Sequence, residues 1–326
     1  MRDPSAPGWQ LLVVALAVGV VGVWLLYYLA NDLVSKFPRS MASALRPYVF
    51  VGPALLVLFA YLIFPTIQTI YYSFLDGRST RFVGLQNYTF VFTDRTMQIA
   101  FRNNILWLVL VTGISVGMGL VIAVLVDRIK WEPIAKSLIF LPMAISFVGA
   151  SVIWRFVYAF QPAGRPQIGL LNAIWTGLGG QPIGWLQTQP LNTFALILIM
   201  IWLQTGFCMV ILSAAVKAVP SELMEAARID GATEIQIFLQ VIIPYVRKTV
   251  VTVATTVIIL VLKVFDIVYV MTSGQFGTEV IANRMYAEMF RFRNFGRGSA
   301  LAVILLLAVI PVMLGNIRSW REERAK

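Results

Sequence analysis

The side chains that most often carry out chemistry in proteins are scarce in this chain. It contains no histidine and one cysteine, Cys208, which excludes imidazole catalysis, an intrachain disulfide and a cysteine-based zinc site. The phosphate-binding pattern G-x-x-x-x-G-K-[ST] is absent, and no carboxylate pair or nucleophile with a base can be assembled from the sequence. The sequence therefore predicts a protein that is not an enzyme and that binds no metal or cofactor of its own.

One polar stretch between two long apolar segments has its charges and helix-ending residues in a definite order. Pro220 ends the preceding helix and is followed by a short acidic segment that favours a new helix. Asp230 and Gly231 then break this helix, because glycine adopts left-handed backbone angles at little cost. Thr233 and Gln236 form a capping-box pattern that starts a second helix. The pattern predicts a helix, a glycine turn and a helix, and a plain solvated hairpin explains it as well as a docking element does.

Four residues inside the apolar segments have side chains that could contact a cargo. Gln204 and Phe207 are three residues apart, so a helix places them on one face, with an amide beside an aromatic ring. Such a lining suits a sugar, which has both hydroxyl groups and C–H faces. Lys263 and Asp266 have the same spacing and could form an ion pair. Core packing explains Phe207 equally well, and a purely structural ion pair is the alternative for the two charges.

The elements that carry these residues are long and apolar. Of the 326 residues, 59% are hydrophobic and 13% are charged, and the mean hydropathy is +0.81, whereas about a quarter of a soluble domain is charged. The net charge of +11 suits a protein beside anionic lipid, while a nucleic-acid-binding protein would be far more polar. The sequence predicts an all-α integral membrane protein that contacts lipid and no nucleic acid.

Seven stretches are long enough to cross the membrane as helices of roughly 20 residues: residues 9–30, 48–72, 104–126, 137–158, 191–215, 248–272 and 298–317. Lys263 then lies near the middle of the membrane, where a charge is by default a functional candidate. Gly113 and Gly117 form a G-x-x-x-G pattern, which predicts close packing against another helix. A slight excess of basic residues on the side of the polar hairpin favours an N-terminus outside and a C-terminus in the cytoplasm.

The polar hairpin also carries a recognisable spacing of residues. It holds Glu225-Ala226-Ala227, then Gly231, Val241, Ile243 and Pro244. This spacing resembles the EAA signature of permease subunits in bacterial ABC importers, with a valine at 241 where isoleucine is usual. Residues 83–88, 202–207 and 265–269 are similar to the sugar-importer branch, so that the resemblance covers about residues 48–317.

The resemblance implies a six-span permease core at residues 47–326, preceded by an extra transmembrane helix and linker at 1–46, in a bacterial inner membrane. It also implies that residues 216–247 form a cytoplasmic coupling loop that docks on a separate ATPase, and that this ATPase holds ATP and Mg²⁺. Glu225 is then expected to pair with a basic residue of the ATPase, while helix capping explains Asp230 equally well. The coupling residues implied are Glu225, Ala226, Ala227, Asp230, Gly231 and Pro244.

The same resemblance implies the partners and the cargo. The partners are a second, similar permease subunit, two copies of the ATPase and an extracytoplasmic substrate-binding protein. The expected cargo is a di- or oligosaccharide such as an α-glucoside, with glycerol phosphate or a polyol as the alternative within the family. An ion-coupled secondary transporter is the alternative of another class. It would show paired halves with interrupted helices, and the sequence has no evident internal repeat.

Overall fold

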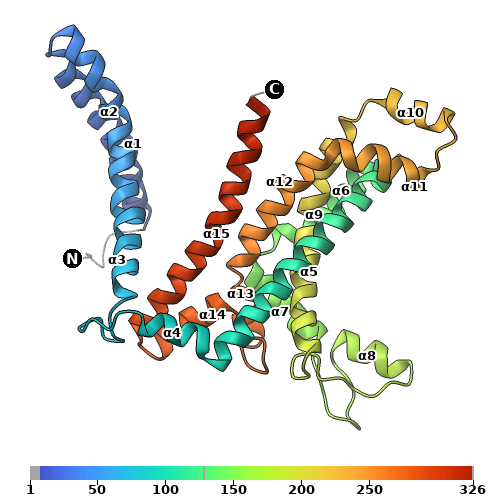
Figure 1. Cartoon of the computed structure of the whole chain (residues 1–326). Helices are drawn as coiled ribbons and strands as arrows, with labels where there is room; N and C mark the ends of the chain where they lie inside the picture. Colours follow the sequence, from blue (N-terminus) through green and yellow to red (C-terminus); the bar gives the residue numbers. More distant parts are fainter. Residues whose placement is uncertain (1–7, 128, 325–326) are drawn as a thin grey trace. The chain divides into compact units, whose positions relative to one another are not determined.

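The computed structural model describes residues 8–127 and 129–324, with side chains described up to residue 315. Nearly all of this described part is helical, and its β pairing is limited to one isolated bridge between Leu75 and Phe82 (Figure 1). The chain divides into two compact units, Met1–Gln68 and Thr69–Lys326. The prediction of an all-α architecture is confirmed.

The first unit is a pair of long apolar helices. It contains α1 (Gly8–Ser35), α2 (Arg39–Leu58), the π-helical turn η1 (Phe59–Ile63) and the beginning of α3 (Phe64–Tyr72). The hydroxyl of Tyr27 donates to the carbonyl oxygen of Phe50 at 3.1 Å, and the two rings stack with centroids 5.7 Å apart. Val34 is the one buried residue of α1, so this helix presents apolar side chains on every face, as a lipid-exposed span does.

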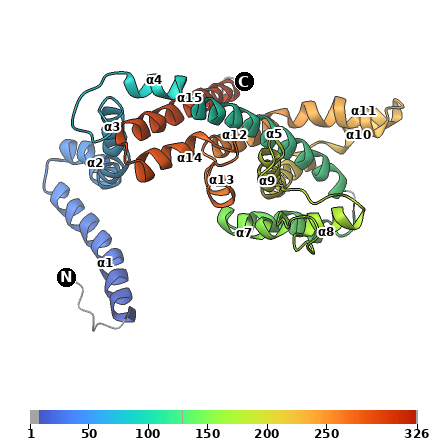
Figure 2. The same cartoon turned by 90° about the horizontal axis from the view of Figure 1, so that it is seen from below.

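The second unit is built on three long helices that lie side by side: α5, α9 and α12 (Figure 1). Trp107, Met209 and Val257, one from each helix, are almost fully buried in the core between them. Figure 2 shows α7 and α8 on one side of α9, with α5 on the other. The helices of this unit are α4 (Gln86–Thr93), α5 (Arg95–Val126), α6 (Glu132–Phe140), η2 (Leu141–Ala144), α7 (Phe147–Val157), α8 (Leu170–Gly177), α9 (Leu191–Lys217), α10 (Ser221–Ile229), α11 (Glu234–Ile237), η3 (Phe238–Ile242), α12 (Ile243–Leu262), α13 (Asp266–Met271), α14 (Ile281–Tyr286), η4 (Ala287–Arg291) and α15 (Phe295–Arg324).

Two glycines let the long helices approach each other closely. A Cβ atom on Gly119 of α5 would lie 2.6 Å from the Cβ of Cys208, and one on Gly206 of α9 would lie 2.4 Å from the carbonyl oxygen of Ile139 in α6. Either contact is shorter than packed atoms tolerate. The prediction for Gly113 and Gly117 is not met within this chain, because a Cβ at either position would have nothing within 4 Å.

Six helices are long and apolar enough to cross a membrane, or seven if a sharply bent pair counts as one span; both counts refer to the described residues. The bent pair corrects the prediction of one continuous helix at 137–158. Helix α6 ends in the 3₁₀ turn that contains Pro142, and α7 leaves this break at an angle of 98°. Ser146 caps α7 by accepting a hydrogen bond from the backbone N–H of Gly149 at 3.0 Å.

The predicted span at 248–272 is also interrupted. Helix α12 ends at Leu262, with Lys263 as its C-cap residue, and the separate helix α13 starts at Asp266. Hydropathy did not reveal this break because residues 263–272 are still mostly apolar, although Lys263 and Asp266 lie among them. The segments predicted at 191–215 and 298–317 lie within α9 and α15, as expected.

Candidate coupling hairpin and transport cavity

The polar hairpin consists of two short helices and a tight turn at one end of the second unit (Figure 1). Gly231 has a backbone φ of +81°, so the predicted requirement for glycine at the turn is confirmed. The predicted capping box is also present: the N–H of Gln236 donates to the Thr233 hydroxyl at 3.3 Å, and the N–H of Thr233 donates to the Gln236 side chain at 2.8 Å. These contacts fix the start of α11.

An ion pair and a backbone hydrogen bond hold the two helices together across the turn. Arg228 Nε lies 3.0 Å from Glu234 Oε1, and the N–H of Ala232 donates to the carbonyl oxygen of Ala227 at 2.9 Å. The N–H of Asp230 continues the helical pattern by donating to the carbonyl oxygen of Ala226. Asp230 therefore has a structural place as the residue that follows α10.

The outer surface of the hairpin mixes a carboxylate with exposed aliphatic side chains. Glu225 and Ala226 are exposed, whereas Ala227 is half-buried and packs against the core. Ile229 is 85% exposed and Ile235 is 71% exposed. Large aliphatic side chains that stand free on a polar element are typical of a docking surface.

The root of the hairpin carries an irregular turn. Pro244 lies at the start of α12 inside the continuous helical segment Glu234–Leu262, so its missing N–H falls where the helical hydrogen-bond pattern is irregular. The π-helical turn η3 directly precedes it and joins α11 to α12. The hairpin is thus continuous with a long helix of the core.

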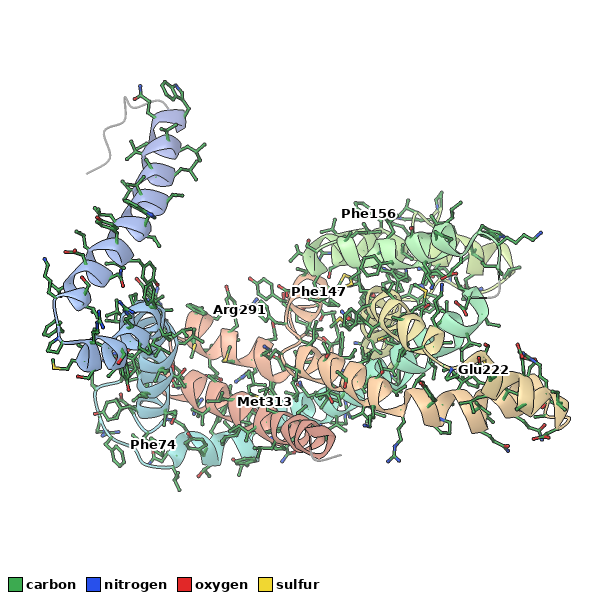
Figure 3. All side chains as sticks on the ribbon, turned by 90° about the horizontal axis from the view of Figure 1, so that it is seen from above. Phe74, Phe147, Phe156, Glu222, Arg291 and Met313 are labelled. Atoms are coloured by element: carbon green, nitrogen blue, oxygen red, sulfur yellow. The ribbon has the colours of Figure 1, made fainter. Side chains whose placement is uncertain are left out.

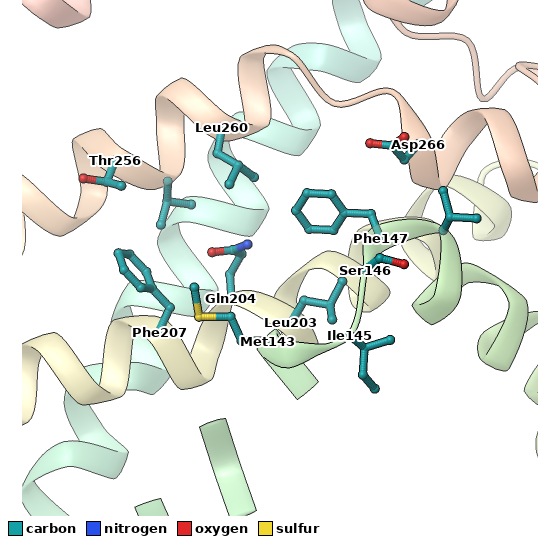
Figure 4. A pocket seen from close by; sticks show the side chains of 12 residues that line it. Met143, Ile145, Ser146, Phe147, Leu203, Gln204, Phe207, Thr256, Leu260 and Asp266 are labelled. Atoms are coloured by element: carbon teal, nitrogen blue, oxygen red, sulfur yellow. The ribbon is translucent and has the colours of Figure 1, made fainter. Parts of the chain in front are cut away.

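A cavity of about 480 Å³ lies where the break between α6 and α7 faces α9, α12 and the start of α13 (Figure 4). Its size falls in the usual range of small-molecule sites. The cavity brings together three of the predicted cargo contacts: Gln204 and Phe207 on α9 and Asp266 on α13. Its lining residues are Met143, Ile145, Ser146, Phe147, Val148, Leu203, Gln204, Phe207, Thr256, Val257, Leu260 and Asp266.

The polar groups of this cavity are few and uncharged except for one. The amide of Gln204 points into the space between Phe207 and Phe147 (Figure 4). Gln204 is 4% exposed, and its side chain makes no hydrogen bond to any other described residue. Thr256 donates its hydroxyl hydrogen to the carbonyl oxygen of Thr252 at 3.0 Å, which leaves its lone pairs free to accept. Asp266 is the one ionisable residue among the cavity's lining residues.

The predicted pairing of Lys263 with Asp266 is wrong. The two residues flank the break after α12, so the regular helix that would align them is absent, and no ion pair joins them in the described part of the chain. Lys263 instead lines a second cavity of about 550 Å³, which also contains Phe265 and Tyr286. Asp266 therefore faces the first cavity without a compensating lysine.

Sequence reasoning missed the cavity residues that come from the α6–α7 break. Met143 and Phe147 enter the cavity because the chain turns sharply between them. Pro142, in the middle of an apolar segment, was the available signal for this turn. The cavity and the hairpin are separate sites, since Phe147 and Glu222 lie apart in Figure 3.

Comparison with known proteins agrees with this architecture. Residues 47–320 match the family described as "Binding-protein-dependent transport system inner membrane component". The osmoprotective compounds uptake permease protein GgtC of Synechocystis is 67% identical over 84% of this chain and 99% of its own length. The α-glucoside transport system permease protein AglF of Rhizobium meliloti is 50% identical over 87% of this chain and 84% of its own length.

Among solved structures, a bacterial ABC transporter involved in the import of the acidic polysaccharide alginate has a TM-score of 0.74, with 18% identity, over 87% of this chain and 98% of that chain. At this identity the likeness concerns the fold. These findings give no support to the ion-coupled secondary transporter. With the family match over residues 47–320, they show that this chain belongs to the binding-protein-dependent inner membrane components, the multi-pass permease subunits of ABC importers.

Proposed function

We propose that this permease imports small uncharged α-glucosidic solutes. The single observation that carries the proposal is the composition of the 480 Å³ cavity, where the free amide of Gln204 lies beside the rings of Phe207 and Phe147. An amide can bond sugar hydroxyls, while aromatic rings cover the C–H faces of the sugar. The names of two relatives agree with this cargo, because AglF is an α-glucoside transport permease and GgtC is an uptake permease for osmoprotective compounds.

The cavity argues against glycerol phosphate as the cargo. A phosphate group is held most strongly by arginine or lysine, and the N-terminus of α7 is the one element favourable to an anion among the residues that line this cavity. Asp266 is the one charged residue that lines this cavity, and Lys263 lines a different cavity. A carboxylate would repel phosphate but can accept hydrogen bonds from hydroxyl groups. An uncharged polyol remains as the second candidate within the family.

We propose that the hairpin at residues 216–247 is the cytoplasmic element that docks on a separate ATPase. Its exposed Ile229 and Ile235 would enter an apolar cleft, and the exposed Glu225 would pair with a basic side chain there. Ala226 and Ala227 would allow close approach, while Gly231 and Asp230 shape the turn. Pro244 would fix the first turn of the helix that leads back into the membrane.

The assembly proposed has two permease subunits, this chain and a similar one, two ATPase subunits and an extracytoplasmic binding protein. ATP and Mg²⁺ would be bound by the ATPase subunits, and the N-terminus would lie outside with the C-terminus in the cytoplasm. ATP-driven closure of the ATPase pair would then move the hairpins and alternate the access of the cavity.

The function is tested by measuring uptake into right-side-out membrane vesicles. These vesicles contain the complete complex and are free of inside-out vesicles. Vesicles loaded with ATP and given the binding protein should take up sucrose, trehalose or maltose, and unlabelled glycerol phosphate should not compete. Uptake driven by an ion gradient without ATP would contradict the ATP-driven importer. Competition by a polyol but by none of the α-glucosides would replace the proposed cargo with the polyol.

A further inference from the structure

A cluster of charges joins three helix ends beside the hairpin. Lys217, the last residue of α9, has its Nζ 2.7 Å from Glu132 Oε1 and 3.4 Å from Asp127 Oδ1. The same Glu132 oxygen accepts a hydrogen bond from Lys136, which also donates to the hydroxyl of Ser213. Charge-assisted bonds of this kind are stronger than neutral ones. The first turn of α6 is thereby tied to the end of α9 and to the residue that follows α5.

These side chains are partly shielded from water. The side chains of Glu132 and Lys136 are 21% and 20% exposed, and Ser213 is buried. Solvent screening of the Glu132 contacts is therefore weaker than for the exposed pair Asp32–Lys36, where the exposed fractions are 53% and 69%. Both ion pairs have i,i+4 spacing. The exposed pair Asp32–Lys36 is therefore a matched control for the shielded pair Glu132–Lys136.

Helix α6 is held against α9 at its other end as well. Gly206 of α9 packs directly on the backbone of Ile139 and Phe140, close enough that a Cβ atom would lie 2.8 Å from the Cα of Phe140. With the charge cluster at one end and this contact at the other, α6 and α9 are fastened along their shared length. A packed pair of this kind moves as one body.

This fastened pair lies between the hairpin and the cavity. Lys217 is four residues before Ser221, where the hairpin helix α10 begins. At its far end α6 leads through the 3₁₀ turn to the 98° break, which supplies Met143 and Phe147 to the cavity wall. A displacement of the hairpin therefore has a short covalent and ionic path to the cavity through Lys217, Glu132 and α6.

We infer that Glu132 is a positioning residue that transmits displacement of the coupling hairpin to the cavity wall at the α6–α7 break. The inference rests on the proposed function, because it assumes that an ATPase moves the hairpin. Without the carboxylate, both lysines lose their shared partner, and the hydrogen bond from Lys136 to Ser213 is what still joins α6 to the end of α9. The hairpin can then move while the cavity wall stays behind.

The test measures both ends of this path in the complete complex of permeases, ATPase and binding protein in proteoliposomes. One reporter is Ser221→Cys, at the exposed start of α10, and the other is Val148→Cys at the cavity, where Val148 is 46% exposed. The native Cys208 is fully buried and does not compete for a maleimide label. The labelling rate of each reporter is compared with and without ATP and vanadate, so that no cargo is needed.

In the complex with Glu132→Gln, the ATP-dependent change in labelling at Ser221→Cys should persist. The change at Val148→Cys should shrink by about three- to tenfold. The matched control Asp32→Asn, which removes the exposed ion pair, should leave both changes intact. An undiminished response of Val148→Cys would overturn the inference, and so would loss of the response at both reporters, since Glu132 would then act in docking.

Further outcomes distinguish a failure of the inference about Glu132 from a failure of the proposed function. If neither reporter responds to ATP in the complex without the Glu132 change, the proposed function fails and the inference falls with it. If Glu132→Gln does not assemble, Lys217→Met is used, which removes one arm of the cluster and should give a smaller loss of the same kind. Where both variants assemble, the double variant should lose no more than Glu132→Gln alone, and additive losses would count against a shared path.

Discussion

At the scale of single residues, the cavity and the hairpin depend on side chains with quite different physical roles. Gln204 is 4% exposed, lines the cavity and has no hydrogen-bond partner among the described residues. An amide that faces a cavity without a partner in the protein is available to bond a ligand there. Gly231 has the opposite character, because a Cβ there would have nothing within 4 Å and its importance lies in its backbone angle.

Replacing Gln204 with leucine should raise the KM for cargo about three- to tenfold, because the cargo loses one hydrogen bond and the cavity keeps its volume. Initial uptake rates over a range of α-glucoside concentrations measure this. Gln98→Leu, at an exposed position of α5 outside the cavity, is the control and should leave KM unchanged. An unaltered KM in Gln204→Leu would remove this residue from the cargo site.

Replacing Gly231 with valine should abolish uptake while the protein still inserts in the membrane. A β-branched residue at a φ of +81° carries strain of about 1–3 kcal/mol, which distorts the turn. Gly231→Asn is the control, since asparagine tolerates left-handed angles, and it should retain most of the uptake. Normal uptake by the valine variant would show that the turn is not needed for coupling.

Reversing the charge of Glu225 with arginine should reduce recovery of the ATPase in pull-downs about tenfold, because a like charge would then face the basic residue of the ATPase. Glu222→Arg is the matched control, as Glu222 is an exposed carboxylate in the first turn of the same helix. The ion-pair role of Glu225 is refuted if both variants recover the ATPase equally well.

At the scale of elements, hydropathy predicts which segments are apolar but not the path they take. The stretch 191–215 became α9 almost as predicted because it has no proline or charge to interrupt it. The stretch 137–158 contained Pro142, and the helix breaks there. The break after Lys263 had no such signal: neither glycine nor proline is present, so tertiary packing of α13 decides it.

The hairpin was predicted more completely than the cavity for a physical reason. Its turn and capping box depend on neighbours in the sequence, such as Thr233 and Gln236, so local chemistry determines them. The cavity depends on residues from four separate segments, and no local pattern shows that Phe147 and Phe207 line the same cavity. Gln204 could be predicted as a cavity residue because a single amide within an apolar helix stands out in the sequence.

The close contact between α6 and α9 yields an element-scale prediction. Gly206→Ala should lower the free energy of unfolding by about 1–3 kcal/mol, because its Cβ would lie 2.4 Å from the carbonyl oxygen of Ile139. The midpoint of thermal unfolding in detergent measures this change. Gly117→Ala, where a Cβ has nothing within 4 Å, should not lower the midpoint. Equal midpoints for the two variants would show that the contact is loose enough to absorb a methyl group.

At the scale of the whole molecule, the orientation in the membrane determines whether the hairpin can meet an ATPase. The exposed hairpin should lie in the cytoplasm and the N-terminus outside. In intact cells, an impermeant maleimide should therefore fail to label a cysteine placed at Asp230 and should label it after the cells are opened. A cysteine at Arg165, in the loop between α7 and α8, is the control that should react from outside. Labelling of the Asp230 position in intact cells would invert the proposed topology.

The sulfur of Cys208 has a consequence for the redox chemistry of the chain. It is fully buried against Gly119, between α5 and α9. This is the chain's one thiol. Oxidants and glutathione on either side of the membrane therefore cannot react with a thiol of this chain while the two helices stay packed together. Oxidation of the Cys208 thiol in the unmodified protein would therefore show that α5 and α9 have separated. The rate of this oxidation would then measure how often the two helices come apart.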